Sequence, residues 1–152
     1  MENEKQTENF ENQLTRAAVG FLQESAKWSK FMAIIGFIGI GLMVLVSLFM
    51  AIGFGAMGAS KIPELPFSMS VFSIIYVLFA AIYFFPVYYL YQYATKTSAA
   101  LHSKNKQLLA DGLENLKSHH KFLGIFTLIL VSLYGFIFVF AILGGILSTL
   151  RE

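Results

Sequence analysis

Histidine and aspartate are the side chains in this sequence best suited to metal binding or acid–base catalysis. His119 and His120 are adjacent, and adjacent side chains on a helix point about 100° apart, so they do not form the i, i+4 pair of a zinc site. His102 stands apart from them, and Asp111 is the one aspartate. The chain has no cysteine and no HExxH or GxSxG motif. We therefore predict no catalytic residues, no metal ligands and no cofactor, and expect that the protein is not an enzyme.

The longest parts of the chain carry no charge at all. Uncharged runs cover residues 31–60, 65–95 and 122–150. Proton relays and most ion-coupled transporters need charged side chains inside the membrane, so a transporter with its site inside one copy is disfavoured. The polar groups expected to be buried within the runs are the hydroxyls of Ser47, Ser73, Tyr76, Thr127, Ser132 and Tyr134. We expect them to bond to each other or to backbone carbonyls, with a polar path as the alternative.

Composition defines the fold class. Of 152 residues, 57% are apolar and 13% are charged, and the mean hydropathy is +0.66. So few polar side chains cannot cover a soluble globule of this size. The runs are apolar on all sides and lack the alternation of a barrel strand, so helices are favoured. We predict an all-α integral membrane protein with three transmembrane helices, over about 31–58, 67–93 and 122–148.

Two further helices are predicted outside the spans. Apolar residues recur at helical spacing over about 14–29 and 98–119, with charged residues between them, which predicts two amphipathic cytoplasmic or interfacial helices. Residues 1–12 are predicted to be a disordered acidic tail, and 13–152 a single helical membrane domain. The turn at 61–64 makes the first two spans an antiparallel hairpin. Residues 20–42 and 111–133 are similar, and shared physical needs explain this more readily than duplication.

The cations predict the orientation. They are Lys5, Arg16, Lys27 and Lys30 before the first span, Lys61 in the turn, Lys96, Lys104, Lys106, Lys117 and Lys121 in the connector, and Arg151 at the end. Basic segments resist translocation across a membrane. We therefore expect the N-terminus and the connector to be cytoplasmic, and the turn and the C-terminus to lie outside.

Aromatic and basic residues mark the predicted membrane borders. The interfacial anchors are Trp28, Lys30, Tyr88, Tyr89, Tyr91 and Lys121. Pro86 lies within the tyrosine-rich stretch and is predicted to kink the second span. An interfacial belt is favoured there, and a lipid-binding or ligand-binding groove at the kink is the alternative.

Small residues predict where helices pack. Their candidate positions are Ser47, Ala51, Gly55 and Ala59 in the first span and Ala141, Gly144, Gly145 and Ser148 in the third. Small residues at this spacing let two backbones approach closely. The contact is equally well explained by packing within one chain and by a seam between copies.

Three stretches resemble an uncharacterised family of small bacterial inner-membrane proteins, known as a domain of unknown function. They are residues 27–36 at the first membrane entry, 82–91 in the second span and 116–124 at the third entry. The resemblance covers about residues 20–145. It implies a multi-pass helical protein of the inner membrane, and it supplies no catalytic residues.

These observations favour a non-enzymatic membrane protein that acts as a subunit, scaffold or modulator through helix–helix and membrane-surface contacts. The alternative is an oligomeric pore or permeation module. The expected partners are the lipid bilayer and either further copies of the chain or another membrane protein. A net charge of +2 without a basic stripe argues against nucleic acid.

Overall fold

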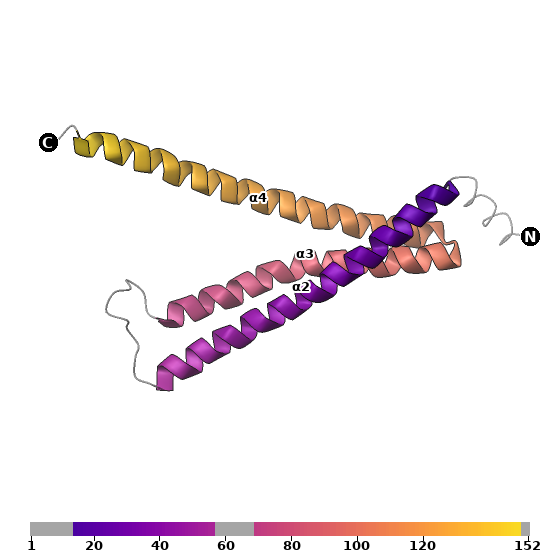
Figure 1. The fold of residues 1–152 in the computed structure, drawn as a ribbon, viewed down its shortest axis with the longest axis horizontal. Coiled ribbons are helices and arrows are strands. Elements are labelled where there is room, and N and C mark those ends of the chain that lie inside the picture. Colours follow the sequence, from indigo (N-terminus) through magenta and orange to yellow (C-terminus); the bar gives the residue numbers. More distant parts are fainter. Residues whose placement is uncertain (1–13, 57–68, 150–152) are drawn as a thin grey trace, which may run out of the picture. The chain divides into compact units, whose positions relative to one another are not determined.

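The computed structural model describes residues 14–56 and 69–149, and its elements are three long helices (Figure 1). Helix α2 covers Arg16–Ala56, α3 covers Met69–Ser103 and α4 covers Lys106–Thr149. All three are long and apolar enough to cross a membrane, which confirms the predicted all-α membrane class. The predicted tail over 1–12 and the predicted turn at 61–64 lie outside the described residues.

The chain divides into two compact units, which we describe separately. The first unit ends at His119 and the second begins at His120. The first therefore contains α2, α3 and the first turns of α4, whereas the second contains the rest of α4.

Helix α2 begins with an N-cap and then runs without a break into the apolar span. The hydroxyl of Thr15 accepts a hydrogen bond from the backbone N–H of Ala18 at 3.2 Å, which satisfies one of the unpaired N–H groups at the helix start. The predicted amphipathic segment 14–29 is therefore the first part of α2 and not a helix of its own. A change from mixed to apolar composition does not end a helix, since it leaves the backbone hydrogen bonds in place.

The predicted connector helix over 98–119 is wrong as a single element, because the chain reverses at Lys104 and Asn105. Lys104 has a φ of 52°, in the left-handed region. The N–H of Asn105 donates to the carbonyl of Ala100 at 3.1 Å, the closing bond of a Schellman motif at the end of α3. The Asn105 side-chain oxygen then accepts from the N–H of Leu108 at 3.1 Å and caps α4.

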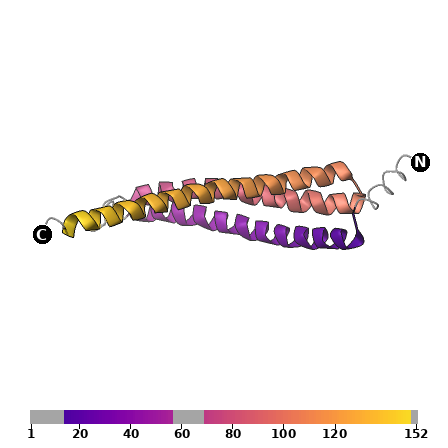
Figure 2. The same ribbon diagram turned by 90° about the horizontal axis from the view of Figure 1, so that it is seen from above.

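Helices α2 and α3 lie side by side and antiparallel in both views (Figures 1 and 2). The buried and half-buried face of α2 follows steps of three and four residues: Leu22, Ala26, Ser29, Ala33, Gly36, Ile40, Met43, Ser47 and Met50. On α3 the matching positions recur every seven residues: Ser73, Ala80, Val87, Ala94 and Leu101. This is the heptad spacing of a left-handed helix pair. Most of these side chains are small, so the two backbones can approach closely.

The first turns of α4 fold back along α3. An added Cβ at Gly112 would lie 2.6 Å from the hydroxyl oxygen of Thr97 and 3.2 Å from its backbone nitrogen. Near the Lys104 reversal, Ala100 and Leu109 form a buried apolar cluster that Leu14 packs against. The first unit is thus held by α2 against α3 and by a short α3–α4 hairpin.

Candidate helix-association site

The predicted small-residue ladder of α2 does not form one continuous contact in the structure. Ser47 is 1% exposed and lies in the contact with α3, whereas Ala51, one turn further on, is exposed. The surroundings of Gly55 and the position of Ala59 lie outside the described residues. The α2–α3 contact alternates steps of three and four residues and continues from Ser47 to Met50, so Ala51 lies beside the contact and outside it.

Two hydroxyls form hydrogen bonds in the α2–α3 contact near the end where α2 stops and α3 begins. The hydroxyl of Ser73 donates to the carbonyl of Ser47 at 2.9 Å, and the hydroxyl of Ser47 donates to the carbonyl of Val44 at 2.8 Å. Both serines are buried. The expectation that Ser47 and Ser73 would bond to backbone carbonyls is thereby confirmed.

A second polar group of contacts lies toward the Lys104 reversal. The hydroxyls of Ser25 and Tyr93 are hydrogen-bonded at 3.1 Å, and Tyr93 is 1% exposed. Nδ1 of His119 lies 2.7 Å from the carbonyl oxygen of Pro86. Because a carbonyl can only accept, His119 donates this bond from a protonated Nδ1. Pro86 itself lies inside the continuous helix α3.

One turn beyond Tyr93 along α3 lies a buried hydroxyl without a hydrogen-bond partner. Thr97 is 0% exposed, and its Oγ1 has no hydrogen-bond partner. It faces Gly112 at a distance that leaves no room for a side chain. A weak Cα–H···O contact is the interaction that such a close approach permits.

The second unit presents a helix whose described side chains are all exposed or only half-buried. One face of it, which we call the α4 stripe, repeats at steps of three and four residues: Gly124, Thr127, Val131, Tyr134, Phe138 and Ala141. Gly145 and Ser148 continue the spacing, although their surroundings lie outside the described residues. Tyr134 is 67% exposed, and within the described residues neither Tyr134 nor Thr127 makes a hydrogen bond. Gly144 lies beside the stripe and has open space around its Cα.

The predicted interfacial anchors are exposed or half-buried. Trp28 is 57% exposed, and Lys30 and Lys121 are exposed. The ring of Tyr88 stacks on Phe84, and its hydroxyl accepts a hydrogen bond from Gln92 at 2.9 Å. Tyr89 and Tyr91 are half-buried, and the rings of Tyr91 and Phe37 on α2 form an edge-to-face pair with centroids 6.0 Å apart.

The histidines lie apart from one another in their contacts. Nδ1 of His102 lies 2.7 Å from the carbonyl of Ser98, within its own helix, whereas His119 bonds across to α3. Within residues 14–56 and 69–149, no group of three or more His, Cys, Asp or Glu side chains could hold a metal ion.

Sequence reasoning missed three features of the described chain. Two of them are glycines that meet another helix: a Cβ at Gly36 would lie 2.8 Å from a methyl group of Val87, and a Cβ at Gly112 would lie 2.6 Å from the Thr97 hydroxyl. The sequence does not show which of its glycines make such contacts. The cap at Asn105 had a readable signal, an asparagine directly before a run of helix formers.

Comparisons with known proteins add no relative. No protein-family model matches the chain, no curated protein matches it and no solved structure matches it. The resemblance to a family of bacterial inner-membrane proteins stays a prediction.

Proposed function

We propose that this protein is a non-enzymatic membrane subunit that acts by associating with another membrane helix through the α4 stripe. The observation that carries the proposal is the contrast between the helices. Helices α2 and α3 share a continuous buried contact, whereas from His120 onward no α4 residue whose burial the structure describes is buried.

The two hydroxyls of the α4 stripe strengthen this proposal. Thr127 and Tyr134 lie seven residues apart and therefore on one face of the helix. A hydroxyl inside hydrocarbon without a hydrogen bond costs free energy, and hydrogen bonds between transmembrane helices contribute about 0.6 kcal/mol on average. Lipid chains cannot supply the partner, whereas a second helix can.

The remaining members of the stripe suit a helix partner as well. Gly124 and Ala141 are small, and they flank the bulkier Val131, Tyr134 and Phe138. Small side chains let a facing backbone approach closely at the two ends of the stripe, and the larger side chains between them supply packing area. A second copy of the chain would bring the same set of side chains to the contact.

We place the protein in the inner membrane of a bacterium, with the N-terminus and the Lys104 reversal on the cytoplasmic side. The described cations before the apolar part of α2 and around the α3–α4 hairpin support this orientation, because basic segments resist translocation. The resemblance stated above supports the bacterial inner membrane.

Crosslinking followed by purification from native membranes tests the proposal. The expected result is a defined complex, containing either further copies or another membrane protein, whose yield falls when Tyr134 is changed to Leu. Ile129→Leu, on the opposite face of α4, is the matched control and should leave the yield unchanged.

A flux assay in liposomes separates the subunit from a pore. The proposal predicts no ion conductance beyond that of protein-free liposomes. Selective conductance that rises with copy number would instead favour the pore module, and a chain that purifies alone after crosslinking would contradict both.

A further inference from the structure

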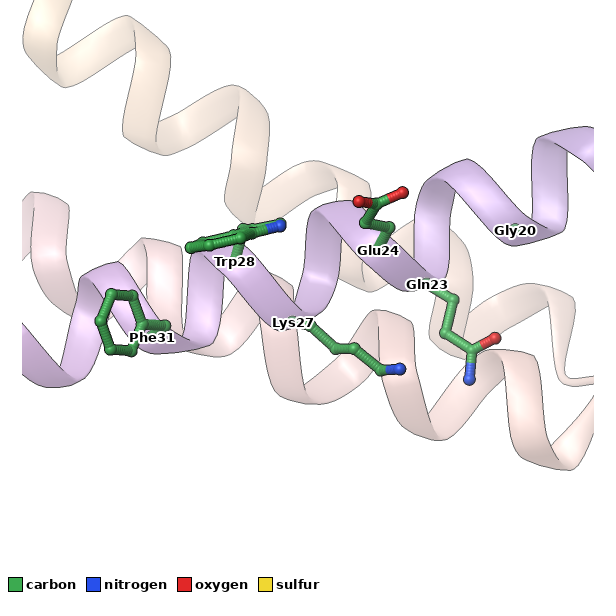
Figure 3. A pocket seen from close by; sticks show the side chains of 6 residues that line it. All are labelled: Gly20, Gln23, Glu24, Lys27, Trp28 and Phe31. Atoms are coloured by element: carbon green, nitrogen blue, oxygen red, sulfur yellow. The ribbon is translucent and has the colours of Figure 1, made fainter.

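A shallow hollow lies on one face of α2, just before its apolar span. It measures about 640 Å³, and the residues that line it are Gly20, Gln23, Glu24, Lys27, Trp28 and Phe31. Figure 3 shows two rows of side chains, with Glu24 and Trp28 on one side of the helix and Gln23 and Lys27 on the other. Gly20 leaves one end of the hollow open, since nothing lies within 4 Å of where its Cβ would be. We call this feature the Trp28 hollow.

The Trp28 hollow lies at the level where a lipid headgroup would be. Lys30 is the last charged residue before the uncharged run that begins at Phe31. The rings of Trp28 and Phe31 meet edge to face with centroids 5.9 Å apart, and both residues are more than half exposed. Tryptophan concentrates at the border between headgroups and hydrocarbon, because its ring is apolar and its N–H is polar.

Opposite charges face this hollow from its two sides. Glu24 and Lys27 form no ion pair with each other, and among the described residues neither has another polar partner. A carboxylate beside an indole ring suits a cation, because the ring face attracts positive charge. An ammonium group beside an amide suits a phosphate. The hollow thus offers a place for a positive and a negative group at the same time.

We infer that the Trp28 hollow binds the headgroup of a phospholipid that is zwitterionic and carries a primary amine. The amine would bind Glu24 and the face of Trp28, the phosphate would bind Lys27 and Gln23, and an acyl chain would pack along Phe31. A primary ammonium donates hydrogen bonds to a carboxylate, whereas a choline group has no N–H to donate. A glycerol headgroup has no positive charge to offer Glu24.

The fluorescence of Trp28 reports on this binding directly, because Trp28 is the one tryptophan of the chain. The full-length protein is placed in vesicles of equal parts ethanolamine, choline and glycerol phospholipids. In three separate preparations, one headgroup class at a time carries bromine on its acyl chains, and bromine quenches tryptophan at short range. We expect the ethanolamine lipid to be enriched at Trp28 by about two- to fivefold over the other two, the range of a partly exposed ion pair.

Two variants show whether Glu24 sets this preference. Glu24→Gln should abolish the preference, so that ethanolamine and choline lipids quench Trp28 about equally. Glu114→Gln makes the same change at an exposed glutamate of α4 that does not line the hollow, so the enrichment should persist. Circular dichroism checks that both variants keep their helix content. Equal quenching by all three headgroups would show ordinary lipid contact only and overturn the inference. A preference that survives Glu24→Gln would overturn it as well.

Discussion

Lys104 shows how one residue sets the boundary between two helices. Its φ of 52° places a side chain with a Cβ in the left-handed region, where an L-residue loses about 1 to 2 kcal/mol and glycine does not. Lys104→Gly should therefore raise the free energy of unfolding by about 1 kcal/mol, since glycine is the preferred residue at this position of a Schellman motif. Denaturation in mixed micelles, followed by circular dichroism, measures the change.

The matched control for this prediction is Lys106→Gly, two residues further on. Lys106 is the first residue of α4 and has an ordinary helical backbone, so glycine there should lower the free energy of unfolding by up to about 1 kcal/mol. If Lys104→Gly lowered the free energy of unfolding as Lys106→Gly does, the left-handed conformation of Lys104 would be contradicted.

At the scale of the element, the α2–α3 contact depends on glycine at one position. A Cβ at Gly36 would lie 2.8 and 2.9 Å from the two methyl groups of Val87. Valine has few rotamers, so the helices must move apart. Gly36→Ala should lower the free energy of unfolding by about 1 to 3 kcal/mol. Gly39→Ala, where nothing lies within 4 Å, should leave stability unchanged or raise it by up to about 1 kcal/mol. Equal changes in the free energy of unfolding for the two variants would contradict close packing of α2 against α3 at Gly36.

The α3–α4 hairpin gives a second prediction at this scale. Gly112→Ala should destabilise the protein by about 1 to 3 kcal/mol, because its Cβ would meet Thr97. Adding Thr97→Ala removes the contact at 2.6 Å but not the one with the backbone nitrogen at 3.2 Å, so the double variant should recover part of the loss. A double-mutant cycle with no coupling would mean that α4 does not pack against Thr97.

The three helices that are long and apolar enough to cross a membrane could be predicted from the sequence, because each long uncharged run has the length and composition of a transmembrane helix. The residues at which the helices begin and end were predicted less accurately. Segment 14–29 looked like a separate amphipathic helix, yet nothing in it breaks the backbone hydrogen bonds that continue into the span. The register of the α2–α3 contact was also missed. The four-residue spacing of small side chains predicted that Ser47 and Ala51 lie in the same contact. In the structure, the residues of α2 that contact α3 near Ser47 are Ile40 and Met43, and Ala51 is exposed.

For the whole molecule, orientation in the membrane is the feature that the sequence predicts most strongly and that the helices alone do not reveal. Fusions of a reporter enzyme within residues 104–106 should be active in the cytoplasm, and fusions after Glu152 should be active outside. Since nine cations lie on one predicted side and two on the other, removing Lys30 alone should leave the orientation unchanged. A reversed pattern of reporter activity would contradict this account.

Contact of the α4 stripe with another protein helix in the membrane can be tested by a scan with a photo-reactive amino acid. The residue is placed singly at 127, 131, 134 and 138 on the stripe and at 129 and 136 on the opposite face, and the cells are illuminated intact. If the stripe binds a partner helix, we expect adducts heavier than one chain at the four stripe positions and few or none at 129 and 136. Adducts of equal yield at all six positions, or none heavier than one chain, would contradict it.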